Sequence, residues 1–527
     1  MGVQIFLTVK GGDISPKLWE RIYTESLVLL ENFPAKLTRL KAEEIRDEKR
    51  YVYTPEIVCN RNAPTEHWTV DGDMTSRQEA EPFDLFRDHA SQFPNEHGSI
   101  DESDGHDVLW AEPDDEFEDF YGNGRLLWDS KTQGRPYHYA ILAVGMLVES
   151  RCPRAAYVIG DIDRGQAEQA KEWADALLEQ PIDLPVCVDA DRLFRRTLEM
   201  YGHVRQAFRR FSTLFRGESC EVWPAIVRNA DSAGVHACLI EELKSFAGRG
   251  VSDEAIRYLE ATGDVAGLIA AVDEIASSGT PDADGISVEE LLKTLCAHSI
   301  TIPLEERRAV PAGVLPPLPE GNSDESLWKT FFKLTLSRPT TELYIRAEDL
   351  LDQFVKAEPR HRKPFREIIE RSEKKAREDL RWLSEKMSEF GEGGATGESG
   401  ASTAEASIRD EIARQTPRYT DEEAMARDTG VVIRKVLRSA PDIEGLASRE
   451  AMLRAMYRAT WENQIVLTAS SWDEIDALQD LETLTHLVGL ASVPSSELHF
   501  CNWRRHLLER PALWATLVGP PSSASGC

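Results

Sequence analysis

Two carboxylates follow an apolar run near residue 160, and they are the first candidates for chemistry. Residues 155–159 (AAYVI) are followed by Gly160, Asp161, Ile162 and Asp163. If the run is a buried strand, both carboxylates lie at the carboxyl edge of a sheet, where open α/β sheets bind their ligands. Carboxylate oxygens also bind divalent metals. We therefore take Asp161 and Asp163 as candidate catalytic and metal-binding residues.

The same two aspartates have a simpler interpretation as helix caps. Aspartate is common just before a helix, where its side chain accepts a backbone N–H, and we favour this role. The run from Gly160 to Gly165 is one residue shorter than the Gly-Asp-x-x-Asp-Arg-Gly motif of metallophosphoesterases. The companion motifs of that family, Gly-Asp-x-His and Gly-Asn-His-Glu, are absent from the sequence. We therefore exclude membership of that family.

A second group of acidic side chains surrounds Gly72. Asp71 and Asp73 flank this glycine. Two aspartates can bind a hard cation, alone or together with Asp161 and Asp163, so they are candidate metal ligands. The dipeptide Asp-Gly is also the commonest signal of a β-hairpin turn. We favour a turn here, preceded by a strand.

A third candidate site precedes a helix that begins at Pro136. Glycine gives the backbone freedom, and the amides at a helix start bind anions. Gly134 and Arg135 are therefore candidate anion-binding residues. His138 is a candidate general base, although a histidine on an apolar helix face is more often buried with its hydrogen bonds satisfied.

The elements that would position these residues form the centre of an α/β domain. Residues 136–150 and 162–181 have helix patterns, and residues 155–161 and 182–189 are short apolar runs. A helix that joins two buried strands makes them parallel, with a right-handed crossover. We therefore expect these two strands in the middle of the sheet.

The N-terminal region adds further elements to this domain. Residues 3–9 predict a strand, and Ser15 and Pro16 predict the start of a helix, because serine caps helices and proline suits the first turn. Residues 35–49 are a charged connection, and residues 50–58 predict an interrupted strand.

Composition along the chain predicts the domain organisation. We expect an α/β N-terminal domain, with a mixed, partly parallel sheet and helices on both faces, followed by predominantly α-helical modules. The helices of the middle module have no fixed period, so we do not predict a repeat solenoid. Stretches rich in Gly, Pro and Ser predict linkers. The segments are an α/β domain at 1–215 with an acidic loop at 79–123, a helical module at 216–308, a Pro/Gly-rich linker or loop at 309–326, a mixed segment ending in a long charged helix at 327–390, a flexible linker at 391–407, a C-terminal helical unit at 408–519 and a frayed tail at 520–527.

Composition also limits the classes of function. The chain has 527 residues, of which 91 are acidic and 61 basic, and its net charge is −30. This charge disfavours nucleic-acid binding and docking on anionic membranes, and it suits a basic protein partner or solubility alone. No apolar stretch could span a membrane, and the start lacks a signal-peptide pattern. The eight cysteines include no C-x-x-C pair, so we expect a cytoplasmic protein with free thiols.

Two function hypotheses remain. The sequence contains no G-x-S-x-G, G-x-x-x-x-G-K-[ST] or G-x-G-x-x-G motif. We therefore expect a non-enzymatic protein–protein interaction protein with an acidic surface, such as a neutralising partner of a basic protein or toxin. The alternative is a metal-dependent hydrolase, a phosphoesterase or nuclease, with its carboxylate site at the edge of the N-terminal sheet. Only this alternative requires a cofactor, a divalent metal.

Overall fold

The computed structural model divides the chain into two units, and one of them combines both ends of the sequence. The composite unit contains Met1–Trp110, Tyr121–Val188 and Ala401–Cys527, and the helical unit contains Ala111–Phe120 and Asp189–Gly400. The structure describes residues 3–34, 37, 39–54, 58–60, 65–73, 78–94, 106–112, 123–245, 251–277, 287–308, 341–389, 404–415, 419–439, 446, 448–495 and 497–519.

A three-stranded antiparallel sheet forms the centre of the composite unit. β1 (Gln4–Val9) lies between β7 (Arg125–Lys131) and β8 (Ala156–Gly160) and pairs antiparallel with both. Every residue of β1 after Gln4 is buried. Since successive side chains of a strand point to opposite faces, both faces of this strand are covered.

A second antiparallel sheet lies beside β7. It contains β4 (Val58–Asn60), β5 (His67–Asp73) and β6 (Gln78–Phe86), paired in that order. β6 is next to β7, and the Trp128 indole N–H donates to the Asp84 carbonyl at 2.8 Å. The first part of the predicted acidic loop is therefore a strand.

The helix α3 (His138–Arg151) is the innermost helix of this part of the unit. Almost all of its residues are buried, and it packs against α1 (Pro16–Glu31), α4 (Arg164–Asp175) and β8. At Gly145, an added Cβ would lie 2.8 Å from a methyl group of Val158. The apolar run after Pro136 thus forms a helix that is surrounded by protein, as its composition predicts.

The prediction of a parallel strand pair is wrong, because the second strand does not form. β8 forms, but Val186–Val188 is a short 3₁₀ helix. The buried Glu149 carboxylate accepts the Val186 amide at 2.7 Å and the Val158 amide at 2.9 Å. Because the Val186 amide already has an acceptor, this apolar run needs no strand partner. The predicted fold class is confirmed, since small sheets precede mostly helical segments.

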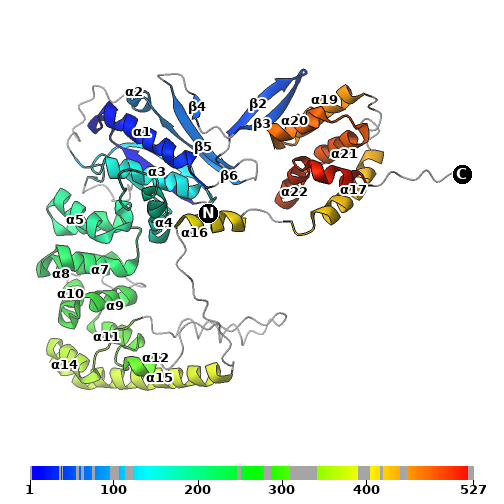
Figure 1. The fold of residues 1–527 in the computed structure, drawn as a ribbon. Helices are drawn as coiled ribbons and strands as arrows, with labels where there is room; N and C mark the ends of the chain where they lie inside the picture. Colours follow the sequence, from blue (N-terminus) through cyan, green and yellow to red (C-terminus); the bar gives the residue numbers. More distant parts are fainter. Residues whose placement is uncertain are drawn as a thin grey trace. The chain divides into compact units, whose positions relative to one another are not determined.

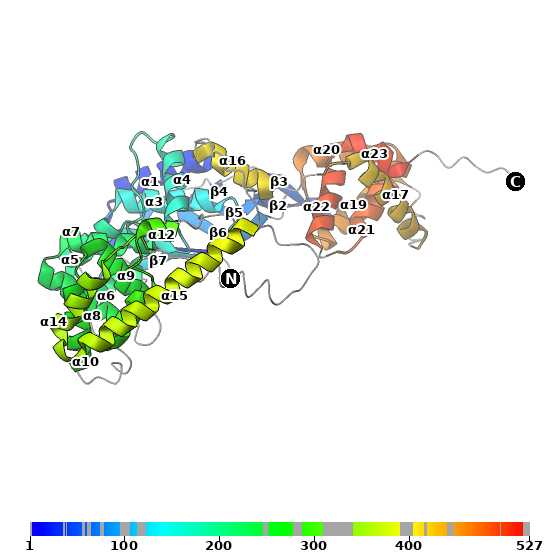
Figure 2. The same cartoon turned by 90° about the horizontal axis from the view of Figure 1, so that it is seen from below.

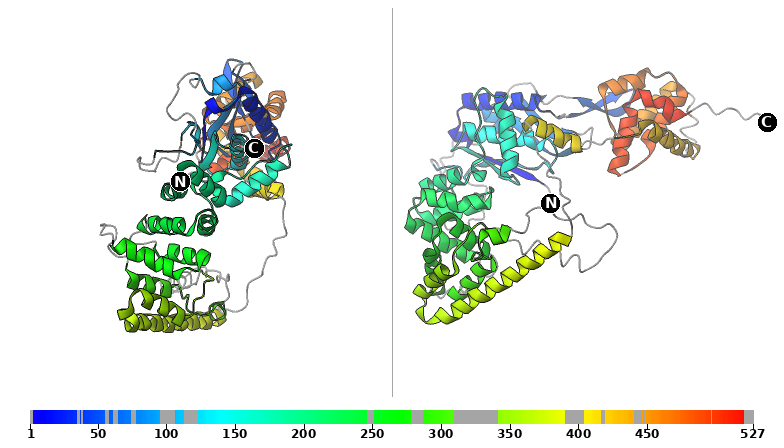
Figure 3. Two further views of the ribbon diagram at one scale, coloured as in Figure 1. Left: turned by 90° about the vertical axis from the view of Figure 1, so that its left-hand side faces the viewer. Right: turned by 60° about the horizontal axis from the view of Figure 1, so that its bottom comes forward.

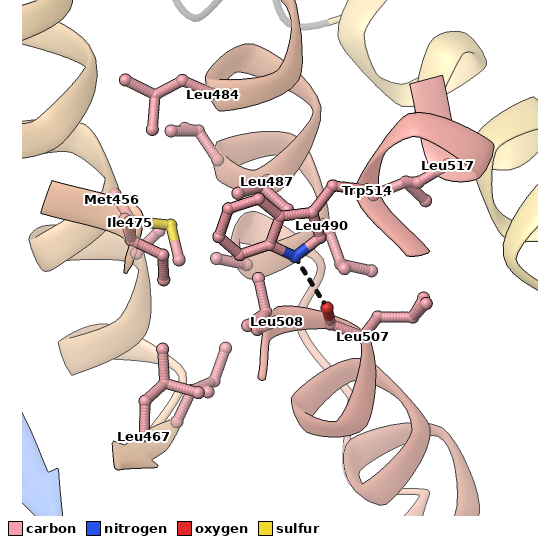
Figure 4. Packing of buried hydrophobic residues seen from close by; sticks show 14 of the residues in the cluster. Met456, Leu467, Ile475, Leu484, Leu487, Leu490, Leu507, Leu508, Trp514 and Leu517 are labelled. Carbon is pink, nitrogen blue, oxygen red and sulfur yellow. Dashed lines mark hydrogen bonds between the residues drawn. The ribbon is translucent and has the colours of Figure 1, made fainter. Parts of the chain in front are cut away.

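Helices near the end of the chain form a C-terminal module (residues 419–519) with its own core. Figure 4 shows Trp514 among leucine side chains, with its indole N–H donating to the Leu507 carbonyl at 2.9 Å. The same core includes the buried Trp472. Its elements are α17 (Glu422–Arg438), α19 (Arg449–Glu462), β9 (Val466–Thr468), α20 (Ala469–Ala477), α21 (Leu481–Ser492), α22 (Leu498–Leu508) and α23 (Pro511–Val518).

A hairpin from the N-terminal region (residues 39–54) completes this module. Its strands β2 (Arg39–Ile45) and β3 (Glu48–Thr54) pair antiparallel, and β3 pairs in parallel with β9. Figure 1 shows the hairpin beside α19 and α20, and β3 contacts both helices. Parallel strands therefore occur in this fold, although at a different place from the predicted one.

The prediction of a charged connection at 35–49 is wrong from residue 39 onward, where the hairpin forms. Arg46 and Asp47 join its strands with φ angles of 53° and 63°, as in a type I′ turn. Arg46 pairs with Glu450 of α19 at 3.2 Å. The charged side chains of this stretch therefore contact a segment that is distant in the sequence. From the neighbouring residues alone, they would be expected to face solvent.

The helical unit is a two-layer stack of helices (Figure 3). In each layer every helix contacts the next member of that layer. This is the arrangement of an α-solenoid, which the sequence analysis did not predict because helix lengths and connections vary. One layer consists of α5 (Ala190–Tyr201), α7 (Val222–Asn229), α9 (Val251–Thr262), α11 (Val288–Ala297) and the long α15 (Arg362–Glu389; Figure 2). The other consists of α6 (Val204–Leu214), α8 (Ser232–Ser245), α10 (Val265–Ser277) and α14 (Ala347–Ala357).

The remaining described helices are short or peripheral. They are α2 (His89–Gln92), α12 (Leu304–Arg308) and α16 (Ala404–Gln415), and α16 packs against α4. In the described part of the chain, no helix has the length and apolar character needed to cross a membrane. The predicted linker at 309–326, residues 391–403 of the second linker, the acidic run at 113–122 and the tail at 520–527 lie outside the described residues.

Candidate functional site

Asp163 is the N-cap of α4. Its side chain accepts the Gln166 amide at 2.8 Å, and the Gln166 side chain accepts the Asp163 amide at 3.4 Å. This reciprocal pair is a capping box, which satisfies two amides at the helix start. Asp163 therefore has the capping role that the sequence favours.

Asp161 lies where the ladder between β1 and β8 ends. Its amide donates to the Gln4 carbonyl at 2.9 Å, and its carboxylate accepts the Gln4 amide at 3.0 Å. Gly160 has a φ of 144°, and an added Cβ would lie 2.2 Å from the Gln4 carbonyl oxygen. The Gly-Asp pair is thus explained by the strand end: glycine allows the close approach, and aspartate accepts the amide.

His138 is buried near these two aspartates. It is 3% exposed, and its Nδ1 lies 2.9 Å from the Thr132 hydroxyl. Burial lowers the pKa of His138 to about 4, although a hydrogen bond with the Gln166 side chain and the charges of Asp163 and Asp161 act in the opposite direction. The ring is therefore neutral at pH 7, as in a histidine that stabilises a core.

Asp71 and Asp73 lie in β5, and each acts on a buried tyrosine. Burial is the main cause of the raised pKa of Tyr137, and the charge of Asp71 adds to it. Burial also raises the pKa of Tyr53, with Asp73 as the next cause. Within the described residues, which include all four candidate aspartates, no three His, Cys, Asp or Glu side chains are placed to hold a metal ion. The four aspartates therefore do not form one metal site.

The turn predicted at Asp71 and Gly72 is wrong, because both residues lie inside β5. The pairing of β5 with β6 shifts register between Val70 and Gly72, which is a β-bulge. Gly72 has a φ of 98°, and an added Cβ would lie 2.4 Å from the Gln78 carbonyl oxygen. The glycine is needed for the bulge and its close contact with β6.

The candidate anion site before α3 is a series of tight turns. Gly134 has a φ of 67°. The Arg135 amide donates to the Thr132 carbonyl at 2.9 Å, and the His138 amide donates to the Arg135 carbonyl at 2.9 Å. Because these two amides already have backbone acceptors, the geometry gives them no role in anion binding.

No protein-family model, curated protein or solved structure matches the chain. The functional argument therefore rests on the arrangement of the chain's own residues. The sheet edge brings His138, Asp161 and Asp163 together, but in the roles of a core residue, a ladder end and a cap. The helical unit offers another surface, formed by layers of stacked helices that sequence reasoning did not predict.

Polar contacts join successive helices within each layer of the helical stack. Arg209 of α6 pairs with Glu241 of α8 at 2.7 Å, and Arg228 of α7 pairs with Asp191 of α5 at 3.0 Å. Exposed pairs of this kind contribute little to stability. The buried side chains between the helices, such as Trp223, therefore supply most of the cohesion.

Both layers also present adjacent carboxylates to solvent. Asp273 and Glu274 lie on α10, and Glu289 and Glu290 lie on α11. The side chain of Glu274 is 57% exposed, that of Glu289 49% and that of Glu290 56%. These carboxylates are accessible to a partner even where a basic neighbour of the same unit lies close.

One carboxyl inside the stack has an unusual environment. Burial raises the pKa of Glu242 on α8 to about 7, and the charge of Glu254 on α9 adds to this effect. Arg257 on α9 opposes it. The stack therefore contains a group that changes charge close to neutral pH.

Proposed function

We propose that this protein is a non-enzymatic protein–protein interaction protein and that the two-layer helical stack is its main binding surface. The observation that carries the proposal is the order of the stack, in which each helix contacts the next member of its layer. Stacked helix pairs form extended surfaces, and proteins with this architecture use those surfaces for binding.

The charge of the chain supports a basic protein as the partner. The net charge is −30, and the adjacent carboxylates on α10 and α11 are exposed. Opposite charge accelerates association and selects partners. A basic toxin that this protein neutralises would be one partner of this kind.

The environment of the cysteines supports a place in the cytoplasm. Six cysteines are free: Cys152, Cys187, Cys220, Cys238, Cys296 and Cys501. Burial raises the pKa of Cys152, Cys238 and Cys296 to about 12, so these thiols are protonated and unreactive at neutral pH. Free buried thiols are typical of proteins in a reducing compartment.

Three candidate residues of the metal-dependent hydrolase have other roles in the described part of the chain. Asp163 caps a helix, Asp161 closes a β-ladder, and His138 is buried.

Isolation of the complex from native cells tests the proposal. Full-length protein carrying an affinity tag is purified at low and at high salt, and retained proteins are identified and quantified by mass spectrometry. We expect one basic partner at a fixed molar ratio, released as salt increases. A chain that is recovered alone at both salt concentrations would contradict the proposal.

Two matched variants then locate the binding surface. Asp273→Lys with Glu274→Lys changes one layer, and Glu289→Lys with Glu290→Lys changes the other. Calorimetric titration with the partner should give at least about ten-fold weaker binding for the layer that contacts it, because like charges repel across an interface. Circular dichroism controls for folding. Unchanged affinity in both variants would show that the partner binds elsewhere.

A further inference from the structure

The hairpin joins the C-terminal module through backbone pairing. Tyr51, Val52 and Tyr53 of β3 lie in parallel register with Val466, Leu467 and Thr468 of β9. The Trp472 indole N–H donates to the Tyr51 carbonyl at 2.9 Å. This is the geometry of strand addition, in which a strand extends the sheet edge of a receptor.

The hairpin also supplies part of the module's core. Val52 is 3% exposed and belongs to the same buried cluster as Leu467 and Trp472. Ile45 packs against this cluster from the other strand. The hairpin therefore fills an apolar surface of the module, in addition to pairing with its edge.

A buried cation lies at the centre of the contact. The Arg50 guanidinium donates to the Asp476 carboxylate at 2.9 Å and is 9% exposed. It also lies over the Trp472 ring at 5.0 Å and the Tyr457 ring at 5.7 Å. The Tyr457 hydroxyl donates to the same carboxylate. Arginine, tryptophan and tyrosine at a desolvated centre are typical of the energetic core of a protein interface.

Partly exposed pairs surround this centre. Tyr51 stacks on Trp461 with ring centroids 4.2 Å apart and planes at 16°. Arg458 donates to the Glu48 carboxylate at 2.6 Å, and Arg46 pairs with Glu450 at 3.2 Å. An apolar core within a polar rim is the anatomy of an interface between separate proteins.

We propose that the C-terminal module carries a receptor site for a β-hairpin and that residues 39–54 of this chain fill it. The hairpin then acts as an intramolecular ligand, which ties the module to the N-terminal region of the composite unit. Since an isolated two-stranded hairpin is only marginally stable in water, the hairpin folds on the module. This proposal does not rest on the proposed binding function of the helical stack.

Cleavage of the full-length chain tests the receptor site. A protease site is inserted at residues 416–418, between α16 and α17, because α16 packs against α4 and must stay with the larger fragment. After cleavage, the hairpin is the described segment of the larger fragment that pairs with the module. We expect the two fragments to elute together in gel filtration at micromolar concentration. Separation of the unsubstituted fragments would overturn the proposal.

Substitutions on the hairpin show which contacts retain the module. Tyr51→Ala removes the stack on Trp461 without changing the module, and should weaken retention at least about ten-fold. Glu48→Arg should weaken it up to about five-fold, and combination with Arg458→Glu should restore it, because the ion pair is re-formed with reversed charges. A role of these residues in module folding alone would not give such rescue.

A matched control comes from the same unit. Glu20→Arg breaks the exposed pair between Glu20 and Arg87, whose nitrogen and oxygen lie 2.9 Å apart, and should leave retention unchanged. Equal retention in Tyr51→Ala, Glu48→Arg and the unsubstituted protein would overturn the proposal. A dimer of uncleaved chains that Tyr51→Ala abolishes would overturn its intramolecular form, since a second copy would then supply the hairpin.

Discussion

The helical unit and the C-terminal module are both mainly helical, but they are assembled in different ways. In the helical unit, contacts join helices that are near in the sequence: Arg209 and Glu241 are 32 residues apart. In the module, Arg50 and Asp476 are 426 residues apart. The helical unit is therefore built from contacts between segments that are close in the sequence. The module depends on a contact between segments that are far apart in the sequence.

This difference predicts how far from a substituted residue the structure is destabilised. In a stack where each helix contacts only its neighbours, stability is approximately a sum of local terms. In the module, loss of the hairpin site affects two segments at opposite ends of the chain. Substitutions of the same chemical type should therefore have local effects in the helical unit and distant effects in the composite unit.

The largest contrast should come from two buried tryptophans. Trp472→Ala and Trp223→Ala each remove a wholly buried indole, which costs about 3–5 kcal/mol. Hydrogen exchange should increase in β3 for Trp472→Ala, but only in α7 and its neighbouring helices for Trp223→Ala. Exchange in β3 that stays slow in Trp472→Ala would remove the contrast.

A second contrast compares two arginines. Arg50→Met leaves the Asp476 carboxylate, which is only 23% exposed, without its cation, so we expect a loss of about 3 kcal/mol. Arg209→Met breaks a pair whose arginine side chain is 54% exposed, so the loss should stay below about 1 kcal/mol. Urea unfolding measures both, and equal losses would show that burial does not separate the two pairs.

The pH dependence of the helical unit depends on Glu242. Its pKa rises from 4.5 to about 7 on folding, so the folded chain binds this proton more tightly than the unfolded chain. The contribution of Glu242 to the free energy of unfolding therefore falls as pH rises from about 4.5 to about 7, and it is constant above that pH. Glu242→Gln should stabilise the unit by about 3 kcal/mol at pH 8, and the gain should vanish near pH 4. A gain that does not depend on pH would exclude titration of Glu242 as its cause.

The smallest effect concerns the turn of the hairpin. Asp47 has a φ of 63°, a conformation that glycine adopts at lower cost. Asp47→Gly should therefore stabilise the composite unit by about 0.5 kcal/mol and leave the helical unit unchanged. Thermal unfolding measures the first effect, and hydrogen exchange of α5–α15 checks the second.

Sequence reasoning succeeded where local chemistry decides the structure. Ser15 caps α1 with Pro16 at its first position, and Asp163 caps α4. The apolar run after Pro136 forms the buried helix α3. In each case a few neighbouring residues contain all the information that the element needs.

Sequence reasoning failed where the decisive partner is distant. Residues 39–49 look like a charged connection, because their partners, such as Glu450, lie far along the chain. The strand expected at residues 182–189 is missing because the Glu149 carboxylate accepts the Val186 amide. The site candidates share this limit: the sequence placed Asp71 in a turn, whereas pairing with β6 places it in a strand.

The parallel pairing of β3 with β9 has a consequence for synthesis of the chain on the ribosome. Translation adds about 5–20 residues each second, so the hairpin emerges on the order of 20–80 seconds before its partner strand exists. During this interval residues 39–54 have no module to fold on and remain open to pairing with other chains, which is how unpaired strands initiate aggregation. Nascent chains should therefore depend on a chaperone until residues 466–468 leave the ribosome, and messages truncated before that point should yield insoluble protein.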